Sequence, residues 1–320
     1  MEMKQLLIKI NLILLFFISC SSDSNRAEQS VLPTATVKYV PGEIASDIDG
    51  YIQYYVGNTP IIITVPHGGE INPSIIPDRN GESEKSENTI GIAQYFYTTF
   101  TSGNNNLYPH IIINNIDRAK LDPDTNIESG AQSNYSTIYY NRYHNYIQAA
   151  VDSTEEYFDV GMLVNLVGHK DDSQKIELGY LVSLNDLNQS DTALSNSNVQ
   201  TSINSIASLS SSTLAETIRG FDSVGGKIMD LSCCKPIYYT FDVTPSPDFP
   251  IPDNDDYNIG RYTLLTYGSQ NSISKISAIE FSTPFLNHRD SPYALIALGA
   301  MLVEGIQHLY EQSTGLMLGL

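Results

Sequence analysis

Residues 61–70 read Ile-Ile-Ile-Thr-Val-Pro-His-Gly-Gly-Glu and include two side chains that can bind a metal ion, His67 and Glu70. The two stand three residues apart, close enough to hold one ion from a single turn. The β-branched run before them predicts a buried strand, which Pro66 ends because it has no N–H to donate. Gly68 and Gly69 then allow a tight turn. The alternatives are a hydrogen-bonded structural histidine and a surface acid.

Predicted strands and helices alternate along the chain. These elements must hold the turn that carries His67 and Glu70 in place. The sequence predicts strands at 61–65, 111–113, 162–166, 178–183 and 276–281, and helices from near residue 88, around 139–150 and over 294–310, with a polar loop carrying one short helix at 187–212. This alternation predicts an α/β fold, a three-layer αβα arrangement with a mixed, mainly parallel sheet. Ligands of open α/β sheets bind at the carboxyl ends of the strands, where His67 is expected.

The composition excludes several classes of partner. The chain has 320 residues, of which 17 are Lys or Arg and 36 are Asp or Glu, so its formal net charge is −19. This charge disfavours binding to nucleic acid, and no basic patch suggests it. The cysteines are Cys20, Cys233 and Cys234, and an adjacent pair rarely forms a disulfide, so we expect no disulfide framework.

The amino terminus resembles a bacterial lipoprotein signal. Lys4 and Lys9 precede a short apolar run at 12–18, and Ser19 and Cys20 follow it directly. A lipidated Cys20 would anchor the protein to the membrane, at the outer membrane or cell surface. An uncleaved membrane anchor is the alternative.

These features divide the chain into four parts. We expect a signal peptide at 1–19, a flexible polar tether at 20–37, one folded domain at 38–312 and a tail at 313–320.

Eight short stretches, in order, resemble the N-formylglutamate amidohydrolase family. They are Val-Pro-His-Gly-Gly at 65–69, Ile-Pro-Asp-Arg at 76–79, Asp-Arg-Ala-Lys-Leu-Asp at 117–122, Tyr-His at 143–144, Gln-Lys-Ile-Glu-Leu-Gly-Tyr-Leu at 174–181, Ile-Arg-Gly at 218–220, Tyr-Gly-Ser at 267–269 and Ala-Ile-Glu-Phe at 278–281. The resemblance implies a fold similar to that of zinc carboxypeptidases. It also implies metal-assisted hydrolysis of an amide bond to a small acidic molecule or peptide fragment.

The resemblance assigns roles to particular residues. His67, Glu70 and His169 would bind zinc, and Glu280 would be the general base, or instead a structural partner of an arginine. Arginines bind carboxylates well through their planar fork. Four further residues complete the expected site: Arg118 and Arg289 for the substrate, and Glu177 and Asn165 as support for the ligands.

The chain departs from the family pattern where the third metal ligand belongs. Asn165 stands in place of an Asp, and Val167 stands in place of the expected histidine. His169 lies two residues on, so on a strand it would face the same way as Val167 and could replace the missing ligand. Three hypotheses remain: a zinc amidohydrolase, a carboxypeptidase acting on peptides or cell-wall fragments, and a catalytically degenerate lipoprotein that binds a small molecule or peptide.

Overall fold

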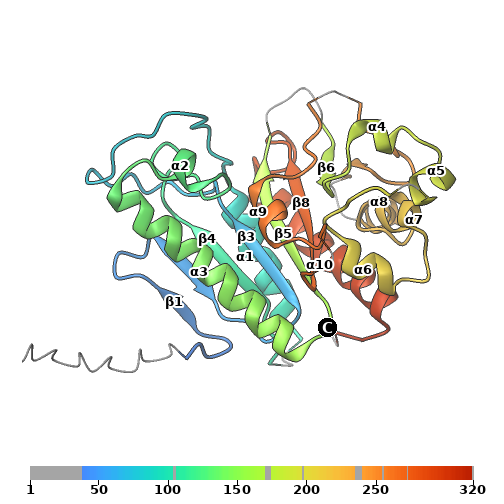
Figure 1. Ribbon diagram of the computed structural model, residues 1–320, viewed down its shortest axis with the longest axis horizontal. Coiled ribbons are helices and arrows are strands. Elements are labelled where there is room, and N and C mark those ends of the chain that lie inside the picture. The colour runs from blue at the N-terminus through green and yellow to red at the C-terminus, as the bar shows by residue number, and fades with distance from the viewer. Residues whose placement is uncertain are drawn as a thin grey trace, which may run out of the picture. The chain divides into compact units, whose positions relative to one another are not determined.

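A mixed sheet of eight strands forms the centre of the protein in the computed structural model (Figure 1). The structure describes residues 38–103, 106–169, 174–196, 198–234, 240–253, 256–271 and 273–318. The predicted signal segment and the whole predicted tether, which includes Cys20, lie outside these residues. Tyr39–Leu320 forms one compact unit.

The order of the strands places four parallel neighbours in the middle of the sheet. The order is β1-β2-β4-β3-β5-β8-β6-β7, with β4, β3, β5 and β8 parallel to one another. Their bounds are β1 Ile44–Ser46, β2 Ile52–Tyr55, β3 Ile61–Val65, β4 His110–Asn114, β5 Gly161–Gly168, β6 Ile176–Gly179, β7 Val243–Thr244 and β8 Ile276–Thr283. Strands β2 and β6 run antiparallel to the neighbours that link them to this core, so the sheet is mixed and mainly parallel, as the sequence predicts.

Three long helices cover the two faces of the sheet (Figure 1). Helices α1 (Thr89–Thr101) and α10 (Pro292–Thr314) pack against each other on one face, and α3 (Asn134–Tyr157) covers the other. A hydrophobic core lies on each face of the sheet, and alternate residues of a strand point into opposite cores. Ile61 and Ile63 pack in the core beneath α1 and α10, and Ile62 packs in the core beneath α3. The three-layer prediction is confirmed.

The remaining helices are shorter. They are α2 (Ile127–Gly130), α4 (Leu184–Leu187), α5 (Asp191–Asn196), α6 (Asn204–Leu209), α7 (Leu214–Arg219), α8 (Val224–Cys234) and α9 (Tyr262–Tyr267). Among the described residues, α10 alone is long and apolar enough to cross a membrane by length and composition. Most of its residues are buried in the protein, which is typical of a core helix.

Several predicted boundaries need correction. The segment predicted as a loop with one short helix begins at the last residue of α4 and holds both α5 and α6. At the start of α5, Ser190 Oγ accepts from the Ala193 N–H at 3.3 Å, since serine caps short helices as readily as it occurs in loops. Strand β6 ends at Gly179 rather than residue 183, since Leu181 adopts a positive φ of 56° that a strand cannot continue through. Helix α10 extends to Thr314, two residues past the predicted end of the domain.

Candidate functional site

The register of the sheet places three polar side chains in one row near the carboxyl ends of the central strands. Thr64 of β3 pairs with Asn165 of β5, which pairs with Glu280 of β8. All three are buried and lie on the face that α3 covers. Thr64 Oγ1 donates to Asn165 Oδ1 at 2.8 Å, and Asn165 Nδ2 donates to Glu280 Oε2 at 3.2 Å. Thr64 and Asn165 are 101 positions apart in the sequence, and Asn165 and Glu280 are 115 positions apart. The three side chains nevertheless form one hydrogen-bonded row.

Asp124 adds a second buried carboxylate beside Glu280. Asn165 Nδ2 donates to Asp124 Oδ2 at 2.9 Å, so this amide bridges the two acids. The Thr263 N–H and hydroxyl also donate to Asp124, at 2.9 and 2.6 Å. Burial raises the pKa of Glu280 to about 8, and the neighbouring charge of Asp124 adds to the shift.

Arg261 covers Glu280 from the solvent side. Its N–H donates to Glu280 Oε2 at 3.1 Å, and its Nε lies 3.4 Å from Glu280 Oε1. Gly260, with a φ of 115°, makes the turn that delivers the arginine. Glu177, expected to support a ligand, instead accepts the Asn258 N–H at 3.0 Å. Glu177 thereby fixes the loop that carries Arg261.

His67 belongs to a buried ionic cluster on the other side of the site. Its Nε2 donates to Asp122 Oδ1 at 2.7 Å, and Asp122 Oδ2 accepts from Arg79 Nη2 at 3.0 Å and Arg118 Nε at 2.9 Å. Burial alone would raise the pKa of Asp122, but His67 and the two guanidiniums outweigh it and hold that pKa well below its usual range. His67 is therefore a partner of Asp122.

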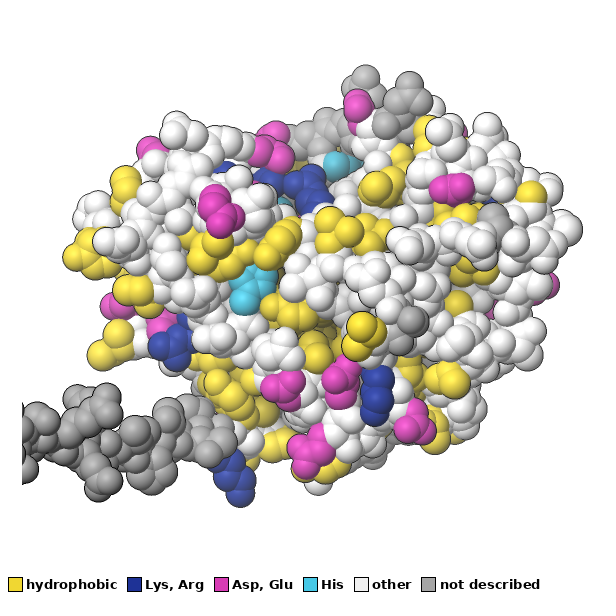
Figure 2. Space-filling view, viewed as in Figure 1, with side chains coloured by type: hydrophobic (Ala, Val, Ile, Leu, Met, Phe, Trp, Pro, Cys, Tyr) yellow, Lys and Arg dark blue, Asp and Glu magenta, His cyan; other side chains and the backbone are white. Residues whose placement is uncertain are grey.

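A cavity of about 160 Å³ opens above these two networks. Figure 2 shows basic and histidine side chains gathered in a hollow at the upper middle of this face. The lining residues are Glu82, Glu84, Lys85, Arg118, Gly168, His169, Arg261 and Arg289. Glu280 is completely buried and does not line the cavity, so Arg261 separates it from any occupant.

Arg118 already binds a carboxylate within this cavity, and that carboxylate belongs to Glu82. Arg118 Nη1 donates to Glu82 Oε1 at 2.7 Å and Nη2 donates to Oε2 at 3.0 Å, the paired geometry typical of an arginine and a carboxylate. Arg261 Nη1 lies 3.5 Å from Glu82 Oε2. Burial would raise the pKa of Glu82, but Arg118 and Arg261 more than offset it, and the pKa is lowered.

Arg289, predicted to bind substrate, instead binds backbone. Its guanidinium donates to the carbonyls of Thr283 and Pro284 at 3.2 Å, to that of His169 at 3.4 Å and to that of Glu87. A Cβ atom on Gly168 would lie 2.3 Å from Arg289 Nη2, so only glycine lets the guanidinium pack against β5. Arg289 therefore joins the loop after β8 to the end of β5.

The residues expected to bind zinc have other partners. Glu70 is 75% exposed at its side chain and pairs with Lys85 at 3.2 Å, and His169 Nε2 donates to the Lys175 carbonyl at 3.1 Å. Burial lowers the pKa of His169 to about 4. Within the described ranges, no group of three His, Cys, Asp or Glu side chains could hold a metal ion. The guanidiniums on Asp122 would also repel a divalent cation beside His67. The site does not fit zinc.

Zinc is therefore expected to bind weakly. Titrating zinc into the metal-free protein should give little heat and no rise in melting temperature, because a structural or catalytic zinc site needs at least three protein ligands. His169→Ala should leave this result unchanged. Val167→His is the informative variant, since Val167 shares the strand face of Asn165. Tight binding by the natural chain that His169→Ala abolishes would contradict the expectation, and tight binding only in Val167→His would indicate a decayed site.

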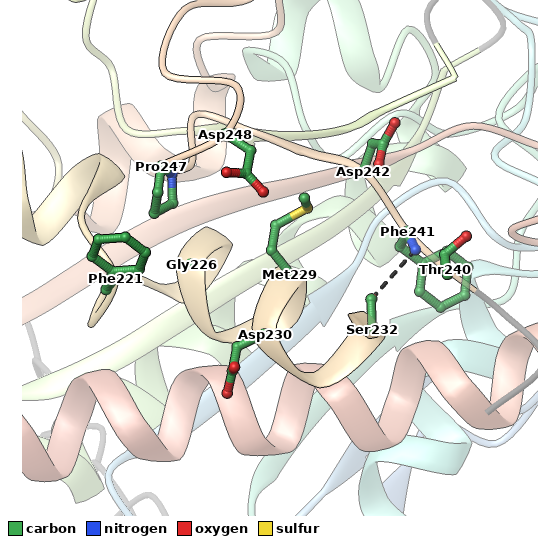
Figure 3. A pocket seen from close by; sticks show the side chains of 10 residues that line it. All are labelled: Phe221, Gly226, Met229, Asp230, Ser232, Thr240, Phe241, Asp242, Pro247 and Asp248. Atoms are coloured by element: carbon green, nitrogen blue, oxygen red, sulfur yellow. Dashed lines mark hydrogen bonds between the residues drawn. The ribbon is translucent and has the colours of Figure 1, made fainter. Parts of the chain in front are cut away.

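A second, larger cavity of about 340 Å³ lies beside α8 (Figure 3). Met229 and Asp248 point toward one another across it, whereas Asp230 turns to another side of the helix. It shares no lining residue with the basic cavity, and no residue predicted for the site lines it. The acids of this cavity do not converge, and we assign it no function.

Sequence reasoning missed most of the residues that complete the site. Asp122 and Arg79 lie within motifs that carry the family resemblance, but their partnership with His67 depends on the fold. Asp124 and Arg261 lie outside the eight stretches that carry the family resemblance. Glu82 stands in a charged, irregular segment, and no local signal marks it as a partner of Arg118.

No family model and no curated protein matches this chain. Solved structures that are similar to it include two at low sequence identity. An N-formylglutamate amidohydrolase from Ralstonia eutropha JMP134 is 11% identical, with a TM-score of 0.47, over 81% of this chain and 97% of that one. The gene product Atu2144 from Agrobacterium tumefaciens is 8% identical, with a TM-score of 0.42, over 79% of this chain and 92% of that one.

Proposed function

We propose that the basic cavity binds a small molecule through a carboxylate group. The observation that carries this proposal is that Arg118 and Arg261 already meet on one carboxylate, that of Glu82. A buried arginine fork recognises a carboxylate through two parallel, charge-assisted hydrogen bonds. The same two arginines can hold the carboxylate of a ligand.

The charge and size of the cavity support an anionic ligand of few atoms. Lys85, Arg118, Arg261 and Arg289 face two carboxylates in the lining, although the whole chain carries a formal charge of −19. A local excess of positive charge in an acidic protein attracts anions to that point. The volume of about 160 Å³ is well below the roughly 300–1,000 Å³ of cavities that hold drug-sized ligands. We therefore expect a short carboxylic acid or an acidic amino acid derivative.

Hydrolysis of an amide ligand is the second candidate function. Glu280 favours it, because a carboxyl group whose pKa burial raises to about 8 has the proton affinity of a general base near neutral pH. Against it, Glu280 lies beneath Arg261 and does not line the cavity. Glu280 would act on a ligand only after Arg261 moves aside. Binding is the function we favour.

Succinate is expected to bind the full-length protein with one-site stoichiometry, and succinamide, its uncharged analogue, is not. Isothermal titration calorimetry measures both. Arg261→Ala should weaken succinate binding about tenfold or more, because a hydrogen bond to a charged group contributes about 1.5–3 kcal/mol. Arg142→Ala is the matched control, since Arg142 is an exposed arginine of α3 that lines no part of the cavity.

Equal affinity for succinate and succinamide, or equal losses in the two arginine variants, would overturn the proposal. Release of formate from N-formyl-L-glutamate, followed in the same samples, separates binding from hydrolysis. Turnover by the natural protein that Glu280→Gln abolishes would establish the second candidate instead. Binding without turnover is the result we expect.

A further inference from the structure

Glu82 extends from an exposed segment into a site that buried residues hold rigid. Residues 80–84 are exposed and form no helix or strand, and 56% of the Glu82 side chain is open to solvent. Arg118, by contrast, is 5% exposed at its side chain, and its Nε is bound to Asp122. The receiving arginine is therefore fixed by the protein interior, whereas the occupying carboxylate is not.

The two ends of the segment are anchored independently of the Glu82 carboxylate. Before it, the Arg79 N–H donates to the Ala119 carbonyl at 2.8 Å. After it, the Ser86 N–H donates to the His67 carbonyl at 2.9 Å, and Ser86 Oγ accepts from the Gly168 N–H at 2.9 Å. Within the segment, the Glu82 carbonyl accepts from Arg79 Nη2 and the Glu84 carbonyl accepts from Arg118 Nη1 at 2.9 Å. Loss of the Glu82 ion pairs would thus free the Glu82 side chain and leave these backbone contacts in place.

We propose that Glu82 is a built-in competitor for the ligand site: it occupies the carboxylate position between Arg118 and Arg261 in the free protein, and a ligand carboxylate displaces it. This inference rests on the proposed function, because it assigns the ligand carboxylate to the position that Glu82 holds. The two carboxylates cannot share the fork, since both oxygens of Glu82 already accept from Arg118. Ligand binding then releases the Glu82 side chain and loosens the segment at residues 80–84.

When a competitor occupies a site, the apparent affinity for the ligand equals the intrinsic affinity multiplied by the fraction of molecules in which the site is open. Glu82→Gln keeps the size of the side chain and removes its charge, so succinate should bind this variant about 3- to 30-fold more tightly than the natural protein, since charge-assisted bonds at a half-exposed pair are partly screened. Glu84→Gln is the matched control, because Glu84 also lines the cavity. Arg118 donates to the backbone carbonyl of Glu84, a bond that this substitution retains. Glu84→Gln should change the affinity by less than about twofold.

Hydrogen exchange provides a second, independent measurement. Saturating succinate should speed amide exchange at residues 80–84 of the natural protein, and should have a smaller effect on Glu82→Gln, in which the Glu82 ion pairs are already lost. If Glu82→Gln and Glu84→Gln bound succinate more tightly by the same factor, the gain would come from removing a negative charge near the cavity. That result would overturn the inference. Weaker binding by Glu82→Gln would overturn it as well, because Glu82 would then assist the ligand.

The two proposals fail in distinguishable ways. If neither the natural protein nor either variant prefers succinate to succinamide, the proposed function itself is wrong. If the natural protein prefers succinate but Glu82→Gln binds it no more tightly, the cavity binds carboxylates and Glu82 does not compete. Each result identifies the statement that fails.

Discussion

Asp122→Asn is expected to lower the free energy of unfolding by about 3–5 kcal/mol at pH 7, the loss typical of removing one partner from a buried ion pair. Asp122 is the one acid whose oxygens meet His67, Arg79 and Arg118 together in the described part of the chain. An asparagine would keep the shape of the side chain but leave the Arg79 guanidinium buried without a countercharge, and Arg118 with the half-exposed Glu82 in place of two carboxylates. Urea unfolding measures the difference.

Asp78→Asn is the matched control for this variant. Asp78 pairs with Lys120 at 2.8 Å, but its side chain is 73% exposed. Exposed ion pairs contribute about 0–1 kcal/mol, so the control should lose no more than that. Similar losses in the two variants would show that burial does not strengthen the Asp122 cluster, and would remove the reason for regarding Arg118 as fixed.

Glu280→Gln is expected to become progressively more stable than the natural protein as the pH rises. Burial raises the pKa of Glu280 from 4.5 to about 8, so between these values the folded state holds a proton that the unfolded state releases. Stability falls with rising pH wherever the folded state binds more protons. At about 1.4 kcal/mol per pKa unit, the difference between the variant and the natural protein should grow by an amount on the order of 3–5 kcal/mol up to about pH 8 and then stay constant.

Comparison with the variant is needed because other groups titrate in the opposite sense. Burial lowers the pKa of His110, His144 and His169 to about 4, so their contribution to stability is lost as the pH falls from 6.5 through 4. These contributions are common to both proteins and cancel in the difference. A difference that stays flat between pH 5 and pH 8 would contradict the raised pKa of Glu280 and weaken hydrolysis as a second function.

The sequence by itself determined the class of the fold and the positions of the central strands. The β-branched run at 61–65 predicts a buried strand of a largely parallel sheet, and the structure places β3 at the middle of the parallel core. Helical spacing likewise identified α3 and α10, because a 3.6-residue period of apolar side chains describes one buried face. These signals are local, since each depends on residues within one element.

The sequence also indicated which polar residues belong near the site, but only the tertiary structure decided what they do. Arg118 and His169 reach one cavity, whereas Glu280 lies beneath Arg261, and Glu70 turns outward to Lys85. Strand register sets the row from Thr64 to Glu280, and register depends on pairing between distant segments.

The partnership between Arg118 and Glu82 illustrates the physical reason for this division. The two residues are 36 positions apart, and Glu82 stands on a segment without periodic structure. Hydrophobic periodicity reports which side of an element is buried, but the partner of a buried charge is set by whichever opposite charge the folded chain brings within about 3 Å. A sequence pattern therefore predicts the sheet and the edge where a site lies, and the folded chain alone decides which carboxylate fills it.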